Sequence, residues 1–149
     1  MKSLFDQATA DELMQRIASL QPDTPRLWGK MNVAQMLAHC SVGMEISLGD
    51  KSTPQVLLGK IFGKWAKAGF FRNGSMRKNT PTAPIYVVAN PGEFAQERDR
   101  LSGLIQRFQV SGPAGCTTGP HAFFGKLQAH EWAILNYVHV DHHLKQFGV

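Results

Sequence analysis

The stretch from Gln128 to Gly148 reads QAHEWAILNYVHVDHHLKQFG. It has no proline, and its only glycine stands at the end, a pattern that predicts a helix over about 128–147. At 100° per residue, a group of side chains lies within about 60° of the direction of His139. This group consists of Trp132, Leu135, Asn136, His142, His143 and Gln146. One face of the helix therefore mixes aromatic, amide and imidazole groups, whereas Ala133, Ile134 and Leu144 lie on other sides.

Three further helices are predicted upstream. One spans about 33–48, with Asn32 as N-cap, Gln35 at the reciprocal capping position and Gly49 after its end. Another spans about 10–20, where Thr9 and Glu12 have the spacing of a capping box. A third begins near Glu93. Four helices with a long crossover after the second predict an all-α, up-down four-helix bundle.

The crossover is harder to interpret. Residues 57–71 have a helical pattern, but Gly59, Gly63 and Gly69 each weaken a helix. Residues 73–84 indicate an extended loop, and only 85–88 resemble a strand. We expect no sheet of three or more strands.

The composition indicates one globular domain over residues 1–149. The chain has 149 residues, of which 43% are hydrophobic, enough for a single core. It contains no run of 18 apolar residues, and Asp6 comes too early for a secretory signal. Two cysteines, Cys40 and Cys116, do not make a disulfide framework. We therefore expect a cytoplasmic protein without a transmembrane anchor.

Positive charge is concentrated in residues 50–91. This segment has seven basic residues and one acidic residue, a net charge of +6, whereas the whole chain carries +5. Such a segment attracts an anionic partner, and Arg72, Arg77 and Lys78 are the candidate anion ligands. The alternative is a solvated, lysine-rich connection. No zinc finger, basic zipper or RNA-binding signature is present, so nucleic acid is not an expected partner.

The histidines are the strongest chemical signal. His139 and His143 are four residues apart, so their imidazoles can converge on one metal ion. A third ligand is needed, and His39 on the 33–48 helix is the candidate, with Gln35 and Gly43 on its face. Gly43 is expected to leave room for a ligand beside the metal. The alternatives are an accidental pair of surface histidines and a hydrogen-bonded histidine in the core.

Other chemistries fail on spacing. His130-Glu131 would begin a zincin motif, but position 134 is Ile. Gly59-Lys60 is not part of a phosphate-binding loop, and the chain has no Gly-x-Ser-x-Gly elbow. Cys40 lies about 100° from His39 on its helix, which disfavours joint ligation.

Two blocks of sequence resemble the DinB/YfiT-like superfamily. The first is Trp28-Gly29-Lys30-Met31 followed by residues 34–40, AQMLAHC. The second is residues 123–127, FFGKL, then Glu131-Trp132, then residues 139–148, HVDHHLKQFG, which is similar to a branch catalogued as a domain of unknown function. The resemblance covers essentially the whole chain.

This resemblance implies a four-helix bundle that holds a divalent metal with three histidines, here His39, His139 and His143. Two features depart from the family pattern. Gln128 stands where a Ser or Thr cap is expected, and His142 adds a histidine beside the pair. The family spacing selects His143 as the ligand and leaves His142 beside the site or exposed to solvent.

Known members of the superfamily include S-transferases and isomerases that use bacillithiol, mycothiol or glutathione, as well as metal-dependent hydrolases. We expect a divalent ion (zinc, nickel, iron or manganese) and a low-molecular-weight thiol as cofactors. The expected substrate is a small molecule, anionic if the basic segment binds it, and a homodimer is compatible with this interpretation. No carboxylate is placed as a general base, which favours thiol transfer over hydrolysis. The remaining alternative is a non-catalytic metal- or ligand-binding module.

Overall fold

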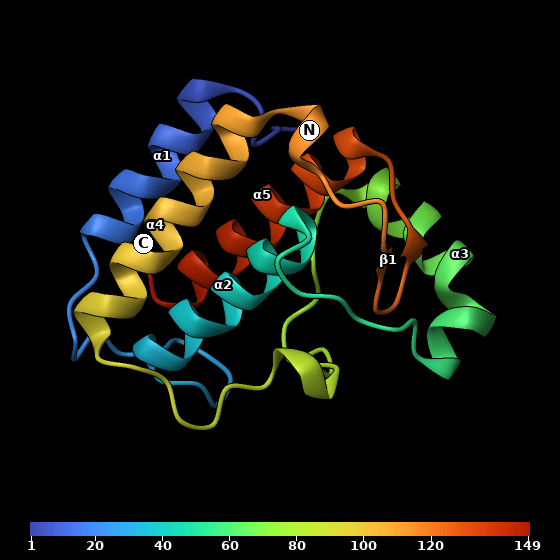
Figure 1. The fold of residues 1–149 in the computed structure, drawn as a ribbon. Helices are drawn as coiled ribbons and strands as arrows, with labels where there is room; N and C mark the ends of the chain where they lie inside the picture. Colours follow the sequence, from blue (N-terminus) through green and yellow to red (C-terminus); the bar gives the residue numbers. More distant parts are fainter.

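The computed structural model describes all residues, 1–149, as a mostly helical fold (Figure 1). Its α-helices are α1 (Gln7–Ala18), α2 (Val33–Leu48), α3 (Leu57–Asn73), α4 (Phe94–Ser111) and α5 (Ala129–Gln146). Two short 3₁₀ turns, η1 (Pro84–Tyr86) and η2 (Pro113–Gly115), and two short strands, β1 (Pro120–His121) and β2 (Gly125–Lys126), complete it. The expectation of a helical fold without a large sheet is confirmed.

Four of the helices share one core. The helix α2 packs against α4 and α5, and α1 packs against the same two helices (Figure 1). The core between them consists of buried aliphatic and aromatic side chains. They include Leu13, Ile17, Leu37, Leu101, Ile105, Phe108 and Leu144. This core holds α2 and α5 side by side, which is the arrangement that positions the histidines.

The helix ends follow the sequence signals in most places. Asn32 and Gln35 form the expected reciprocal capping box of α2, and Gly49 ends the helix with a φ of 81°. At the start of α5, the Glu131 carboxylate accepts a hydrogen bond from the Gln128 backbone N–H, so the missing Ser or Thr is compensated there. The predicted capping box at Thr9 is wrong, because α1 begins at Gln7. Thr9 lies inside the helix, where it is buried.

A fifth helix, α3, occupies the segment whose glycines argued against a helix. Gly59 and Gly63 face the β1–β2 hairpin, and a Cβ atom on either would come within 2.5 Å of the Phe123 carbonyl oxygen. Close approach of α3 to the hairpin therefore requires glycine at both positions. Figure 1 shows α3 beside the hairpin and apart from the other four helices.

The strands are not where the β-like run occurs. Residues 84–86 form the 3₁₀ turn η1, since Pro84 starts a tight turn that ends at Tyr86. The antiparallel β1–β2 pair joins His121 to Gly125 and Pro120 to Lys126 instead. None of the helices has both the length and the apolar character that crossing a membrane requires.

Candidate metal centre

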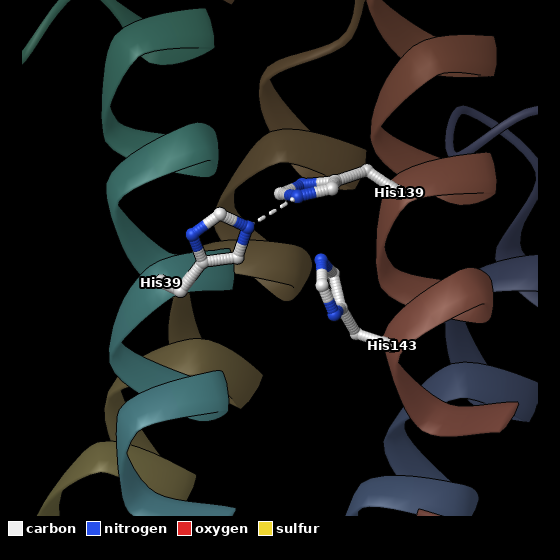
Figure 2. A group of neighbouring side chains, drawn as sticks. All are labelled: His39, His139 and His143. Atoms are coloured by element: carbon white, nitrogen blue, oxygen red, sulfur yellow. Dashed lines mark hydrogen bonds between the residues drawn. The ribbon is translucent and has the colours of Figure 1, made fainter. Parts of the chain in front are cut away.

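Three imidazoles meet between α2 and α5. His39 projects from α2, and His139 and His143 project from successive turns of α5 toward it (Figure 2). One ring nitrogen from each lies within 4.8 Å of the others. His39 and His143 are buried, and His139 is partly exposed toward the adjacent cavity. Nitrogen donors from three neutral imidazoles are a common ligand set for a divalent transition metal.

Backbone carbonyls determine how two of these rings are protonated. The Nδ1 atom of His39 lies 2.8 Å from the Tyr86 carbonyl oxygen, which only accepts, so Nδ1 carries the proton. The Nδ1 atom of His143 lies 2.8 Å from Oε1 of Gln146, whose Nε2 donates to the Trp28 carbonyl oxygen at 2.7 Å. The amide of Gln146 is thereby oriented so that His143 donates to it. Both rings consequently present an unprotonated Nε2, the form that binds a metal.

His139 completes the group differently. Its Nε2 lies 2.8 Å from Nε2 of His39 (Figure 2). Because His39 is protonated at Nδ1, the proton in this contact belongs to His139. A Cβ atom at Gly43 would lie 3.2 Å from Nδ1 and 3.3 Å from Cε1 of His139. Gly43 therefore makes room for the imidazole of His139, and it also lines the adjacent cavity.

The three rings are held neutral. Burial lowers the pKa of His39, and it lowers the pKa of His143 to about 3. Burial also lowers the pKa of His139 well below its ordinary value, and the neighbouring histidines add to this effect. At neutral pH a metal ion therefore does not have to displace a proton from a charged imidazolium, which favours its binding.

A cavity of about 1070 Å³ opens onto the three histidines. It is bounded by α2, α5, the β1–β2 hairpin and the loops at 28–31 and 76–89. Its walls are largely aromatic and aliphatic, with Trp28, Tyr86, Phe123, Phe124 and Trp132 among them. Lys30 and Arg77 are its basic residues, and no Asp or Glu lines it. The cavity thus suits an uncharged or anionic small molecule with an apolar part.

The face of α5 predicted from helical geometry lines this cavity. Trp132, Leu135, Asn136, His142 and Gln146 are all in its wall. The buried Asn136 donates a hydrogen bond to Ser47 on α2, and the indole Nε1 of Trp132 has no partner. His142 is half-buried and packs edge-on against His143 and Trp28, so its place is beside the three-histidine group.

Gln35 also lines the cavity, but its amide is engaged in the fold. Its Oε1 accepts from the Asn32 N–H, and its Nε2 donates to the Ala89 carbonyl. It joins the start of α2 to the loop that follows η1.

The candidate anion ligands lie in three different places. Arg77 lines the cavity. Lys78 lies over the Trp28 ring, with its Nζ 4.1 Å from the ring centre, and lines a smaller hollow with His142. Arg72 lies in the last turn of α3 and lines neither space, because the chain turns at Gly74 before it reaches the cavity.

Sequence reasoning overlooked His121 as part of the cavity. Its Nδ1 accepts hydrogen bonds from the backbone N–H groups of Phe123 and Phe124, each at 3.1 Å. Burial lowers its pKa to about 4, so the ring is neutral with its proton on Nε2. Because His121 lies in a short hairpin, no second histidine stands at helical spacing from it to indicate a site. The Gly and Pro residues around it indicated only a turn.

Neither cysteine is a nucleophile candidate. Cys40 is buried in the core, and burial raises the pKa of its thiol. Burial raises the pKa of Cys116 as well. Both thiols stay protonated at neutral pH.

A family model described as a protein of unknown function (DUF1569) matches residues 2–148. The match covers nearly the whole chain, and the protein belongs to this family. Comparison with curated proteins and with solved structures finds no match to this chain.

Proposed function

We propose that this DUF1569 protein is a divalent-metal-dependent enzyme that transfers a low-molecular-weight thiol to a small electrophile. The proposal includes a single DinB-like domain over residues 1–149, in which α1, α2, α4 and α5 form the four-helix bundle and the crossover contains α3. The setting proposed is the cytoplasm.

The observation that carries the proposal is the convergence of His39, His139 and His143 in the wall of a cavity. Two of the three rings have their metal-binding tautomer set by hydrogen bonds to Tyr86 and Gln146. A divalent ion held there would lower the pKa of a coordinated water to near neutrality or keep a coordinated thiol as thiolate.

The lining of the cavity favours thiol transfer over hydrolysis. Hydrolysis is helped by a carboxylate that takes the proton from the attacking water, and no carboxylate lines the cavity. A thiolate needs no such base once formed. Arg77 and Lys30 supply positive charge for the carboxylates of a thiol such as glutathione.

The metal assignment is tested by metal analysis of single alanine variants. His39→Ala, His139→Ala and His143→Ala should each lose bound ion after purification without chelator, because two remaining ligands are too few for a tight site. His142→Ala should keep the ion with altered activity, and His130→Ala, an exposed position on the same helix, is the matched control. Equal metal content in wild type and His139→Ala would refute the assignment.

The reaction is tested with protein reconstituted with zinc, nickel, iron or manganese. Glutathione, bacillithiol or mycothiol is supplied together with an alkyl or aryl electrophile, and loss of free thiol is followed. Metal-dependent, thiol-dependent turnover that is absent in His139→Ala is the expected result. Ester or amide cleavage without thiol would favour the hydrolase, and a tightly bound metal without either activity would favour a binding module.

A further inference from the structure

The outer face of α3 is apolar and uncovered. Five large side chains contribute to it, with exposed fractions of 73% for Leu57, 62% for Leu58, 60% for Ile61, 45% for Phe62 and 77% for Trp65. At 100° per residue they fall within an arc of about 140°. The opposite face carries the buried Gly59, Gly63 and Phe70 and packs toward the rest of the protein. The first part of α3, over residues 57–65, therefore carries an exposed apolar stripe.

Lysines border this stripe on one side. Lys60 and Lys64 are exposed, and neither has an ion-pair partner. Lys67 lies on the same side and donates to the Glu131 carboxylate. The surrounding segment, residues 50–91, carries a net charge of +6. An apolar stripe that contains Trp and Phe and is bordered by lysines is typical of a helix that lies in the plane of a membrane interface.

We propose that α3 docks on an anionic membrane surface, with Leu57, Ile61 and Trp65 inserted among the lipids and Lys60 and Lys64 at the headgroups. Charge complementarity selects this occupant. A second copy of the chain on the same face would bring the unpaired Lys60 and Lys64 of both copies together, whereas an anionic bilayer neutralises these charges.

Docking in this orientation has a consequence for the cavity. Leu58 belongs both to the exposed stripe and to the cavity wall. The cavity would therefore border the lipid surface, and an apolar small molecule dissolved in the bilayer would reach it without crossing water.

The test is co-sedimentation with vesicles of phosphatidylcholine containing about one third phosphatidylserine, compared with vesicles of phosphatidylcholine alone. Wild-type protein should bind the anionic vesicles, and added salt should weaken the binding. The double variant Ile61→Ser/Trp65→Ser should lose it at unchanged net charge. Val110→Ser is the matched control, since Val110 is 75% exposed on α4, and it should bind as the wild type does.

A second variant tests the contribution of the lysine charges to membrane binding alone. Lys60→Gln/Lys64→Gln alters two exposed side chains and should weaken binding about 25-fold, about fivefold for each lysine. Absence of binding, equal binding to neutral vesicles, or binding that neither variant changes would overturn the proposal. Sedimentation equilibrium supplies a further arm: a wild-type dimer that Trp65→Ser dissociates would make this face a contact between copies and also overturn it.

Discussion

Gln146 should control the metal affinity of the site without ligating the metal. It accepts a hydrogen bond from His143 Nδ1 and donates one to the Trp28 carbonyl, each within 2.8 Å. Its side chain is only 3% exposed, so water does not readily replace it. In Gln146→Leu, His143 loses the acceptor that keeps its proton on Nδ1 and its Nε2 free. We expect metal affinity to fall about 10- to 100-fold, the usual effect of removing a partner of a ligating histidine.

The same substitution should cost stability. One buried N–H left without an acceptor costs about 1–3 kcal/mol, which lowers the Tm of a domain of this size by about 2–12 °C. Thermal unfolding in chelator measures this loss, and competition with a metal indicator measures the affinity. Because both are followed separately, a general loss of fold is distinguished from a specific loss of metal binding.

Two further variants test whether the hydrogen bond from His143 to Gln146 controls metal affinity. Gln146→Glu keeps an oxygen that accepts from His143 but sets its other oxygen against the Trp28 carbonyl, so it should lower stability while binding metal more tightly than Gln146→Leu does. Gln109→Leu is the control, because its amide also donates to a backbone carbonyl, that of Phe5, far from the histidines. If Gln146→Leu binds metal as tightly as Gln109→Leu, then the hydrogen bond from His143 does not determine the ligand form of its ring.

Gly43→Ala should weaken metal binding with little change in helix content, because the new methyl would crowd the His139 ring from 3.2 Å; metal titration and circular dichroism together check this. In metal-free protein, protonation of His121 should lower the free energy of unfolding by about 2 kcal/mol from pH 7 to pH 5. The folded pKa of His121 is about 4 against an ordinary 6.5, so the stability is present above pH 6.5 and is lost as pH falls toward 4; His121→Phe should show a smaller fall in urea unfolding, and an equal fall would contradict this. Arg77→Glu should weaken glutathione binding about fivefold in calorimetry, as expected for one partly screened charge, whereas Arg72→Glu, outside the cavity, should not.

Helical periodicity was sufficient to predict most of the fold and the face of α5. Caps and apolar spacing are local signals, so α2 and α5 were predicted within about one residue of their observed ends. Helix geometry also placed Trp132, Asn136 and Gln146 on the face of His139, and all three line the cavity. Side chains on one regular helix keep fixed relative directions, which is why this part of the site was predictable.

Tertiary contacts explain what sequence reasoning missed. In the sequence, the glycines of α3 indicate a weak helix. Their role is to let the Phe123 carbonyl approach, and because that group lies some 60 residues away in the chain, no local pattern reveals it. His121 lies on a hairpin whose strands have two residues each. Such strands are too short to show a periodic pattern in the sequence, so its place in the cavity wall was not predicted. Arg72, Arg77 and Lys78 are near neighbours in sequence, yet Arg72 precedes the turn at Gly74 and lies outside the cavity, Arg77 lines the cavity, and Lys78 lies over the Trp28 ring.

The chemistry of the centre therefore depends on irregular segments as much as on helices. The helices supply the three imidazoles and their spacing, but helix geometry does not choose which nitrogen is protonated. That choice comes from the Tyr86 carbonyl at the end of η1 and, through Gln146, from the Trp28 carbonyl in the loop before α2. Both loops also line the cavity. Any ligand that displaces either loop would change the donor strength of the histidines, so substrate binding and metal affinity are expected to be thermodynamically coupled, with each strengthening or weakening the other by the same factor.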